Sequence, residues 1–216
     1  MEQVILSYGD SLLRLSDVVL LDPPNWLNDN VIGFTFEYLA SSLAPHLSGR
    51  VCFISPEVSQ FIKCCGREAP TFLEPLALPD KDLILLPVND NAGPEAGGTH
   101  WSLLAYVRQL HGFFHYDSSP GTNFRHAQLM ARHLSPLLGS NLSYKEEEAP
   151  AQHNSYDCGM YVVCIAEAMC AQHLHGCDSL KDITPQYVTR KRMEWKDIIR
   201  GLSSLTVPNI TQVGKA

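Results

Sequence analysis

The segment from residue 152 to residue 161 limits what this chain can be more than any other stretch. It is a polar loop, Gln-His-Asn-Ser-Tyr-Asp, that runs through Cys158 directly into an apolar segment ending at Met169. Asp157 is a residue type that caps helices, so a helix is expected to begin at or beside Cys158. A thiol there faces free backbone N–H groups and the positive end of the helix dipole, and both favour the nucleophilic thiolate. A buried structural cysteine is the alternative, and this segment alone leaves it open.

Hydrophobic periodicity and turn residues predict one α+β domain over residues 1–202, followed by a flexible tail over residues 203–216. The expected strands gather in the middle of the chain as a central mixed or antiparallel sheet, with helices on both sides. Strands are expected at 4–8, 51–54, 82–88, 100–107, 113–117 and 142–147, and helices at 31–43, 55–64, 122–138, 158–173 and 184–202. Cys158 thus begins a central helix.

The composition argues against several classes of function. A net charge of −7 does not suit a general nucleic-acid binder, and no apolar run approaches the ~20 residues that a membrane span needs. The first ten residues lack a secretory pattern, and the seven cysteines form no disulfide framework, so an intracellular home in cytoplasm or nucleus is expected. His173, His175 and Cys177 have no second cluster with zinc spacing, so neither a metal nor a cofactor is expected.

A predicted hairpin supplies the base and the orienting acid that a cysteine nucleophile needs. His100 begins its first strand and Asp117 ends its second, and these two positions lie at the same edge of an antiparallel hairpin. Asp117 would then accept the Nδ1–H of His100 and stabilise the imidazolium. The alternatives are that Asp117 caps a turn and that His100 is an ordinary strand residue. Of the other histidines, His115 is the most serious rival base, whereas His153 lies on a flexible loop.

An oxyanion hole requires hydrogen-bond donors near the nucleophile. Gln152 is the candidate side-chain donor, with the backbone N–H of Cys158 as the second donor; a surface glutamine is the alternative. Trp101 is expected on the face of its strand opposite to the residue before it, where it fits a core aromatic side chain. Trp26 and Trp195 likewise fit core or half-buried positions.

Three motifs, in this order, resemble the sentrin-specific (Ulp-type) cysteine protease family. They are Thr99-His100-Trp101-Ser102, Tyr116-Asp117-Ser118 and the segment that ends in Asp157-Cys158-Gly159-Met160. The resemblance implies the Ulp/adenain-like fold. Within the family, Leu-Asp-Pro-Pro-x-Trp-Leu-Asn-Asp from Leu21 and Phe-Ile-Ser-Pro-Glu-Val from Phe53 are most similar to the short deneddylase members. SUMO-directed members usually carry Gly-Ser where this chain has Ser155-Tyr156.

The resemblance implies a role for each site residue. His100 would be the base, Asp117 its orienting acid, Cys158 the nucleophile and Gln152 the oxyanion donor. Trp101 would cover a narrow tunnel that admits only residues without bulk. The substrate's extended basic tail would be held by Trp26, Asp29, Asp90 and Asn91.

The implied activity is that of a cysteine isopeptidase and endopeptidase that cleaves after the C-terminal Gly-Gly of a ubiquitin-like modifier. The implied modifier is the neddylation modifier, both in its precursor and on targets such as cullins, and the implied state is a monomer. Cys158 would attack the carbonyl of the last glycine, and water would release the modifier from a thioester. The alternatives are a SUMO- or ubiquitin-directed protease, and a non-catalytic module that binds a ubiquitin-like fold.

Overall fold

The structure, a computed structural model, describes residues 2–47, 49–95, 97–176 and 179–206. Its centre is a five-stranded sheet with the strand order β3-β4-β5-β6-β7. The middle strand β5 is antiparallel to both of its neighbours, whereas each outer strand is parallel to its neighbour, so the sheet is mixed, as predicted. The strands are β3 (Val51–Phe53), β4 (Leu83–Asn89), β5 (Trp101–Val107), β6 (Gly112–Tyr116) and β7 (Ser143–Glu147).

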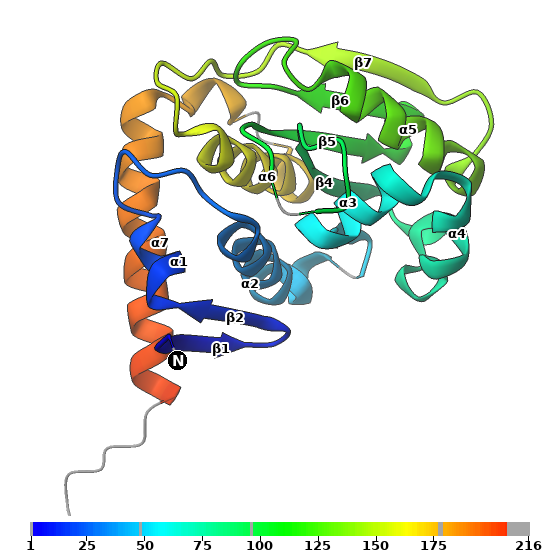
Figure 1. Cartoon of the computed structure of the whole chain (residues 1–216). Helices are drawn as coiled ribbons and strands as arrows, with labels where there is room; N and C mark the ends of the chain where they lie inside the picture. The colour runs from blue at the N-terminus through cyan, green and yellow to red at the C-terminus, as the bar shows by residue number, and fades with distance from the viewer. Residues whose placement is uncertain (1, 48, 96, 177–178, 207–216) are drawn as a thin grey trace, which may run out of the picture.

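Helices cover both faces of this sheet (Figure 1). The side chains of β4 and β5 are apolar on both faces, and successive residues point to opposite sides. Leu85 and Leu103 therefore pack against one set of helices, and Leu86 and Leu104 against the other. The first set is α2 (Asp29–Leu47), α6 (Cys158–His175) and α7 (Pro185–Thr206), and the second is α3 (Pro56–Cys65) and α5 (Phe124–Leu138).

Helix α6 is the core helix of the first layer. It packs against β5, α2 and α7, and its side chains are buried almost all round from Cys158 to Cys170. A helix enclosed on every side must be apolar on every side, which explains why this segment shows no polar face. The predicted helix start is confirmed, because α6 begins at Cys158.

Side-chain caps begin two of the helices. The side-chain oxygen of Asn28 accepts the N–H of Val31 at 3.0 Å at the start of α2, and that of Ser55 accepts the N–H of Val58 at 3.3 Å at the start of α3. The end of α7 differs from the prediction: residues 203–206, expected in the flexible tail, continue the helix to Thr206. The rest of the expected tail, residues 207–216, lies outside the described residues.

The remaining elements are short. An N-terminal hairpin packs against α2 and α7. The sequence predicted its first strand but not its second. Among the described residues, no helix is both long and apolar enough to cross a membrane. The short elements of the fold are β1 (Val4–Tyr8), β2 (Ser11–Arg14), α1 (Leu15–Val19), α4 (Ala69–Phe72) and the 3₁₀ helices Gly66–Glu68, Glu74–Leu76, Leu78–Asp80, Arg108–Leu110 and Leu180–Asp182.

Candidate active site

The β5–β6 hairpin brings a histidine and an aspartate together at one edge of the sheet. His100 immediately precedes β5 and Asp117 immediately follows β6, and the two strands pair in antiparallel register. His100 Nε2 lies 2.6 Å from Asp117 Oδ1, and both side chains are buried. The predicted meeting of the two residues is therefore confirmed.

The ring nitrogen that contacts the carboxylate is not the predicted one. The sequence favoured Nδ1 of His100 as the donor to Asp117, but the structure uses Nε2. Nδ1 is bonded to the ring carbon nearest the backbone, whereas Asp117 lies beyond the distal end of the ring. The proximal nitrogen, Nδ1, is thereby left for the hydrogen bond that His100 makes with Cys158.

The carboxylate of Asp117 is held by backbone as well as by the histidine. Its Oδ1 accepts the N–H of Ser119 at 3.0 Å and its Oδ2 accepts the N–H of Asn123 at 3.0 Å. Burial alone would raise the pKa of Asp117, but the hydrogen bonds from His100 and these N–H groups outweigh it and lower the pKa. Asp117 is thus an anion fixed in place at the edge of the sheet.

Cys158 lies at the first position of α6, buried, with its side chain hydrogen-bonded to His100. Burial disfavours the charged imidazole, but Asp117 and Cys158 together outweigh it and raise the pKa of His100 to about 9. The histidine is therefore an imidazolium at neutral pH, flanked by a carboxylate on one side and a sulfur on the other. This arrangement makes His100 a proton donor before it becomes a base.

Gln152 lies beside the same edge of the sheet. Its backbone N–H donates to the carbonyl of Ser118 at 2.9 Å, and its side-chain oxygen accepts the Ser118 hydroxyl at 2.7 Å. The side-chain nitrogen donates to the carbonyl of Asn154 at 2.7 Å, and a primary amide has a second N–H to offer. The glutamine is thus oriented from both ends, whereas a surface glutamine would be free to rotate.

The rival histidines lie elsewhere. His115 is fully buried, and its two ring nitrogens contact the hydroxyl of Ser102 at 2.8 Å and the carboxylate of Glu146 at 2.9 Å. Both nitrogens are therefore used within the sheet. His153 is exposed on the loop before α6. The structure pairs neither of them with Cys158.

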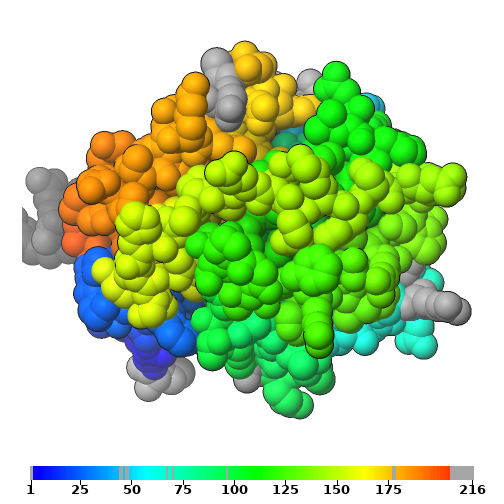
Figure 2. Space-filling view, turned by 90° about the horizontal axis from the view of Figure 1, so that it is seen from above, coloured from blue at the N-terminus to red at the C-terminus, as the bar shows by residue number. Residues whose placement is uncertain are grey.

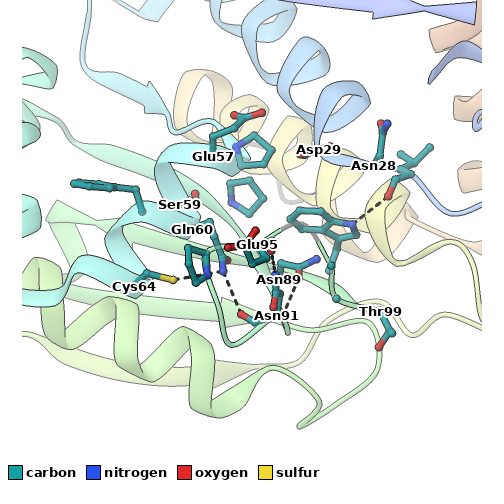
Figure 3. Close-up of a pocket in the computed structure, with 18 of the residues that line it drawn as sticks. Asn28, Asp29, Glu57, Ser59, Gln60, Cys64, Asn89, Asn91, Glu95 and Thr99 are labelled. Carbon is teal, nitrogen blue, oxygen red and sulfur yellow. Dashed lines mark hydrogen bonds between the residues drawn. The ribbon is translucent and has the colours of Figure 1, made fainter. Parts of the chain in front are cut away.

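Cys158 opens into a cavity of about 680 Å³ between the start of α2, helix α3 and the loop of residues 89–99 (Figure 3). Four of the five predicted substrate contacts line it: Trp26, Asp29, Asn91 and Trp101. Trp26 is not a core residue, because 45% of it is exposed. The indole N–H of Trp101 donates to the carbonyl of Leu27 at 3.1 Å and so joins the start of β5 to the segment before α2, both of which line the cavity.

The fifth predicted contact, Asp90, has a different position. Its carboxylate accepts the N–H of Thr99 at 2.6 Å, the hydroxyl of Thr99 at 2.7 Å and the N–H of His100 at 3.0 Å. Burial would raise the pKa of Asp90, but these hydrogen bonds lower it. Asp90 therefore joins the two ends of the 89–99 loop, and its contact with a substrate stays a prediction.

The 89–99 loop is fastened to α3 by two side chains, Gln60 and Lys63. Lys63 Nζ donates to the carbonyl of Asn89 at 2.6 Å. The amide nitrogen of Gln60 donates to the carbonyl of Asn91 at 3.3 Å and to that of Gly93 (Figure 3). Asn91 in turn binds the carbonyl of Glu95 through its own amide, so most polar groups of the loop bind within the loop. Side-chain hydrogen bonds thus hold the part of the cavity wall that the 89–99 loop forms.

Sequence reasoning missed three residues that hold the site: Ser118, Asn123 and Arg192. Asn123 donates from its side chain to the carbonyl of Val88 and the hydroxyl of Ser102, both at 3.0 Å, and so fixes the N–H that binds Asp117. Ser118 is the last residue of the motif Tyr116-Asp117-Ser118, but the sequence analysis gave it no role. Nothing in the periodicity of α7 distinguishes Arg192.

Asp157 also differs from its predicted role. Its side chain does not cap α6; one oxygen accepts from Arg192 at 2.7 Å and the other from Asn154 at 2.7 Å. The other two cysteines of α6, Cys164 and Cys170, are buried. Burial raises the pKa of Cys164 and raises that of Cys170 to about 12. The residues that the structure describes include no cluster of ligand side chains for a metal.

Comparisons with known proteins agree with this geometry. The chain matches the Ulp1 protease family, C-terminal catalytic domain, over residues 25–203. It is 55% identical over 210 residues to sentrin-specific protease 8 of Rattus norvegicus, covering 94% of this chain and 97% of the relative. It is 36% identical over 218 residues to NEDD8-specific protease 1 of Arabidopsis thaliana, covering 94% of this chain and 95% of the relative.

Among solved structures, the chain is similar to the C-terminal Ulp1 protease domain in complex with Smt3, the yeast ortholog of SUMO. The TM-score is 0.75 at 19% identity, over 94% of this chain and 89% of that chain. At this identity the likeness shows the fold, and the fold implied by the sequence motifs is confirmed.

Proposed function

This chain belongs to the Ulp1 protease family, and we propose that it is a cysteine protease that cleaves after the C-terminal Gly-Gly of NEDD8, the neddylation modifier. The observation that carries the proposal is the hydrogen bond of His100 with Cys158, which itself lines the 680 Å³ cavity. The relative from Arabidopsis thaliana, a NEDD8-specific protease that is 36% identical, supports the choice of modifier.

The geometry supports acyl transfer in two steps. The thiolate of Cys158 attacks the carbonyl carbon of the last glycine, and the oxyanion accepts hydrogen bonds from Gln152 and from the N–H of Cys158. His100 then gives its proton to the departing amine, which leaves a thioester. In the second step the neutral imidazole takes a proton from water, the hydroxide attacks the thioester, and the modifier leaves with a free carboxylate. Asp117 keeps the ring oriented in both steps.

The cavity supports an extended substrate tail that ends in glycines. Trp26, Trp101 and Cys158 line it, and the indole of Trp101 is hydrogen-bonded to the backbone of Leu27. We propose that the two indoles leave room beside Cys158 only for residues without side chains. The carboxylate of Asp29 on the cavity wall suits a basic residue in the tail. We propose that the products are mature NEDD8 and free lysine on deconjugated targets such as cullins.

We further propose that the enzyme works as a monomer inside the cell, in the cytoplasm or nucleus. The six cysteines that the structure describes are all free thiols, which fits a reducing compartment. Gel filtration with light scattering and fractionation of cells test the two statements, and a stable dimer or a secreted protein would refute them.

The test of the activity uses NEDD8, SUMO and ubiquitin probes that carry a thiol-reactive group at the C-terminus. We expect the NEDD8 probe alone to attach to the protein, and Cys158→Ala to abolish the reaction. Cys64→Ser is the matched control, because Cys64 is an exposed thiol that lines the same cavity, and it should leave labelling intact. Labelling by SUMO or ubiquitin alone would overturn the choice of modifier, and labelling by none would favour a module that only binds.

A further inference from the structure

Arg192 of α7 is a buried cation. It lies far from Cys158 in the sequence but is hydrogen-bonded to the residues that directly precede Cys158. Only 1% of the residue is exposed. Its Nε donates to Asp157 Oδ1 at 2.7 Å, and its two terminal nitrogens donate to the carbonyls of Leu20, Asn25 and Tyr156 at 2.9, 3.1 and 3.0 Å. Its guanidinium also lies 5.5 Å from the centre of the Tyr156 ring. One side chain therefore serves four acceptors.

These acceptors belong to two segments that adjoin the cavity from different parts of the chain. Tyr156 and Asp157 directly precede the nucleophile, and Leu20 and Asn25 flank the turn that leads into Trp26. The segment before α6 and the N-terminal segment meet on the surface, yellow against blue, in Figure 2. Arg192 lies between them and fixes their separation.

The hydrogen bonds continue from Arg192 toward the predicted oxyanion donor. The second oxygen of Asp157 accepts from the amide of Asn154 at 2.7 Å, and the Asn154 side-chain oxygen accepts the N–H of Asp157 at 2.9 Å. The Asn154 carbonyl accepts the side-chain N–H of Gln152 at 2.7 Å. A displacement of Asp157 would therefore reach Gln152 through one intermediate residue.

Charge gives Arg192 a second reason to be present. Asp157 is a buried carboxylate one residue before the nucleophile, with 5% of its side chain exposed. A buried carboxylate that loses its partner is strongly destabilising. The guanidinium neutralises this carboxylate and turns it away from the start of α6.

We propose that Arg192 is a positioning residue for the protease reaction. Through Asp157 and the turn before Trp26, it holds Cys158 and the cavity wall at Trp26 in a fixed position relative to each other. The inference rests on the proposed function. Arg192 touches neither substrate nor reacting atoms, so its effect reaches the chemistry through Asp157.

The test compares Arg192→Met with Lys191→Met. Lys191 is the adjacent residue of α7 and forms an ion pair with Glu167 of α6 at 2.9 Å, so its loss also weakens the attachment of α7 to α6 without touching the loop before Cys158. The measurements are the melting temperature, kcat and KM on a NEDD8 C-terminal amide, and the rate of alkylation of the Cys158 peptide by iodoacetamide, followed by mass spectrometry.

Arg192→Met should lower kcat by about 10²-fold, because small displacements of reacting groups have effects of that size. It should also slow alkylation, whereas Lys191→Met should change kcat by less than about threefold at a comparable loss of melting temperature. Millimolar guanidinium should restore part of the activity to Arg192→Ala and none to Lys191→Met. A folded Arg192→Met with the kcat and alkylation rate of the control overturns the proposal.

If Arg192→Met does not fold, Arg192→Lys decides. It keeps the charge, but an ammonium cannot reach the same four acceptors, so kcat should fall at least ~10-fold; an unchanged kcat overturns the proposal. Iodoacetamide needs no modifier, so the two hypotheses fail separately. A wild type that cleaves no NEDD8 refutes the function, while slower alkylation of Cys158 in Arg192→Met still supports the positioning role.

Discussion

The catalytic edge, defined as His100, Asp117 and Cys158, meets the 89–99 loop at the cavity that Cys158 lines, but the two regions are held in different ways. The catalytic edge is fixed by the ends of two paired strands and one core helix, and its side chains are buried. The loop is fixed by polar side chains, chiefly Gln60 and Asp90, on a largely exposed segment. The difference teaches that the position of the reacting groups depends on regular secondary structure. The fit to a substrate depends instead on individual side-chain contacts, which substitutions can change.

The largest expected effect is a difference in kcat between substitutions of two aspartates that both bind His100. Asp117 binds its ring and Asp90 its backbone N–H. Asp117→Asn should lower kcat by roughly 10²–10⁴-fold, because an amide orients the imidazole wrongly and does not stabilise the imidazolium. Asp90→Asn should alter mainly KM, because it loosens the loop. Steady-state kinetics on a NEDD8 amide measures both, and equal losses of kcat would break the division between the two regions.

The next effect concerns the oxyanion donor at the catalytic edge. Gln152→Ala should lower kcat by on the order of 10²–10³-fold, the usual effect of one lost donor, and should leave the affinity for NEDD8 unchanged. Ser118→Ala should have a smaller effect in the same direction, because it removes only the hydroxyl that orients the Gln152 amide. Binding is measured calorimetrically in a Cys158→Ala background. Unchanged turnover in Gln152→Ala would remove Gln152 from the mechanism.

A smaller effect should come from the loop itself. Gly98 has a φ of +90°, and a Cβ there would lie 1.9 Å from Asn89 Oδ1, so Gly98→Ala must displace the loop. Strain of this kind is worth about 1–3 kcal/mol, and we expect KM to rise by about tenfold with little change in kcat. Gly93→Ala is the control, because open space surrounds that position. Equal KM values for the two variants would show that the loop does not shape the substrate site.

The same division explains what the sequence could predict. Strand pairing is dictated by apolar segments and a turn, so the meeting of His100 with Asp117 followed from their places at the two strand ends. The start of α6 followed from the polar-to-apolar change at Cys158. The family resemblance then supplied the roles that spacing alone left open.

Side-chain orientation was beyond the same reasoning. No pattern says which nitrogen of His100 reaches Asp117, because that depends on the distance between two strand ends in space. The N-cap rule gave Asp157 the wrong partner, since a buried guanidinium attracts a carboxylate more strongly than a backbone N–H does. Arg192 lies 34 positions after Cys158 in the sequence, on a helix whose pattern does not mark it.

The central claim is that folding joins the imidazole of His100 to both Asp117 and Cys158 in one charged site. The most direct measurement is an NMR titration of the His100 ring in ¹⁵N-histidine-labelled protein. The account predicts a His100 pKa of about 9 in the wild type, above its ordinary 6.5, and lower values in Cys158→Ala and in Asp117→Asn. The protonated His100 ring stabilises the folded state, and this contribution is complete below pH 6.5. It is lost as the pH rises from there through about 9. A His100 pKa near 6.5 that does not respond to Cys158→Ala would contradict the account.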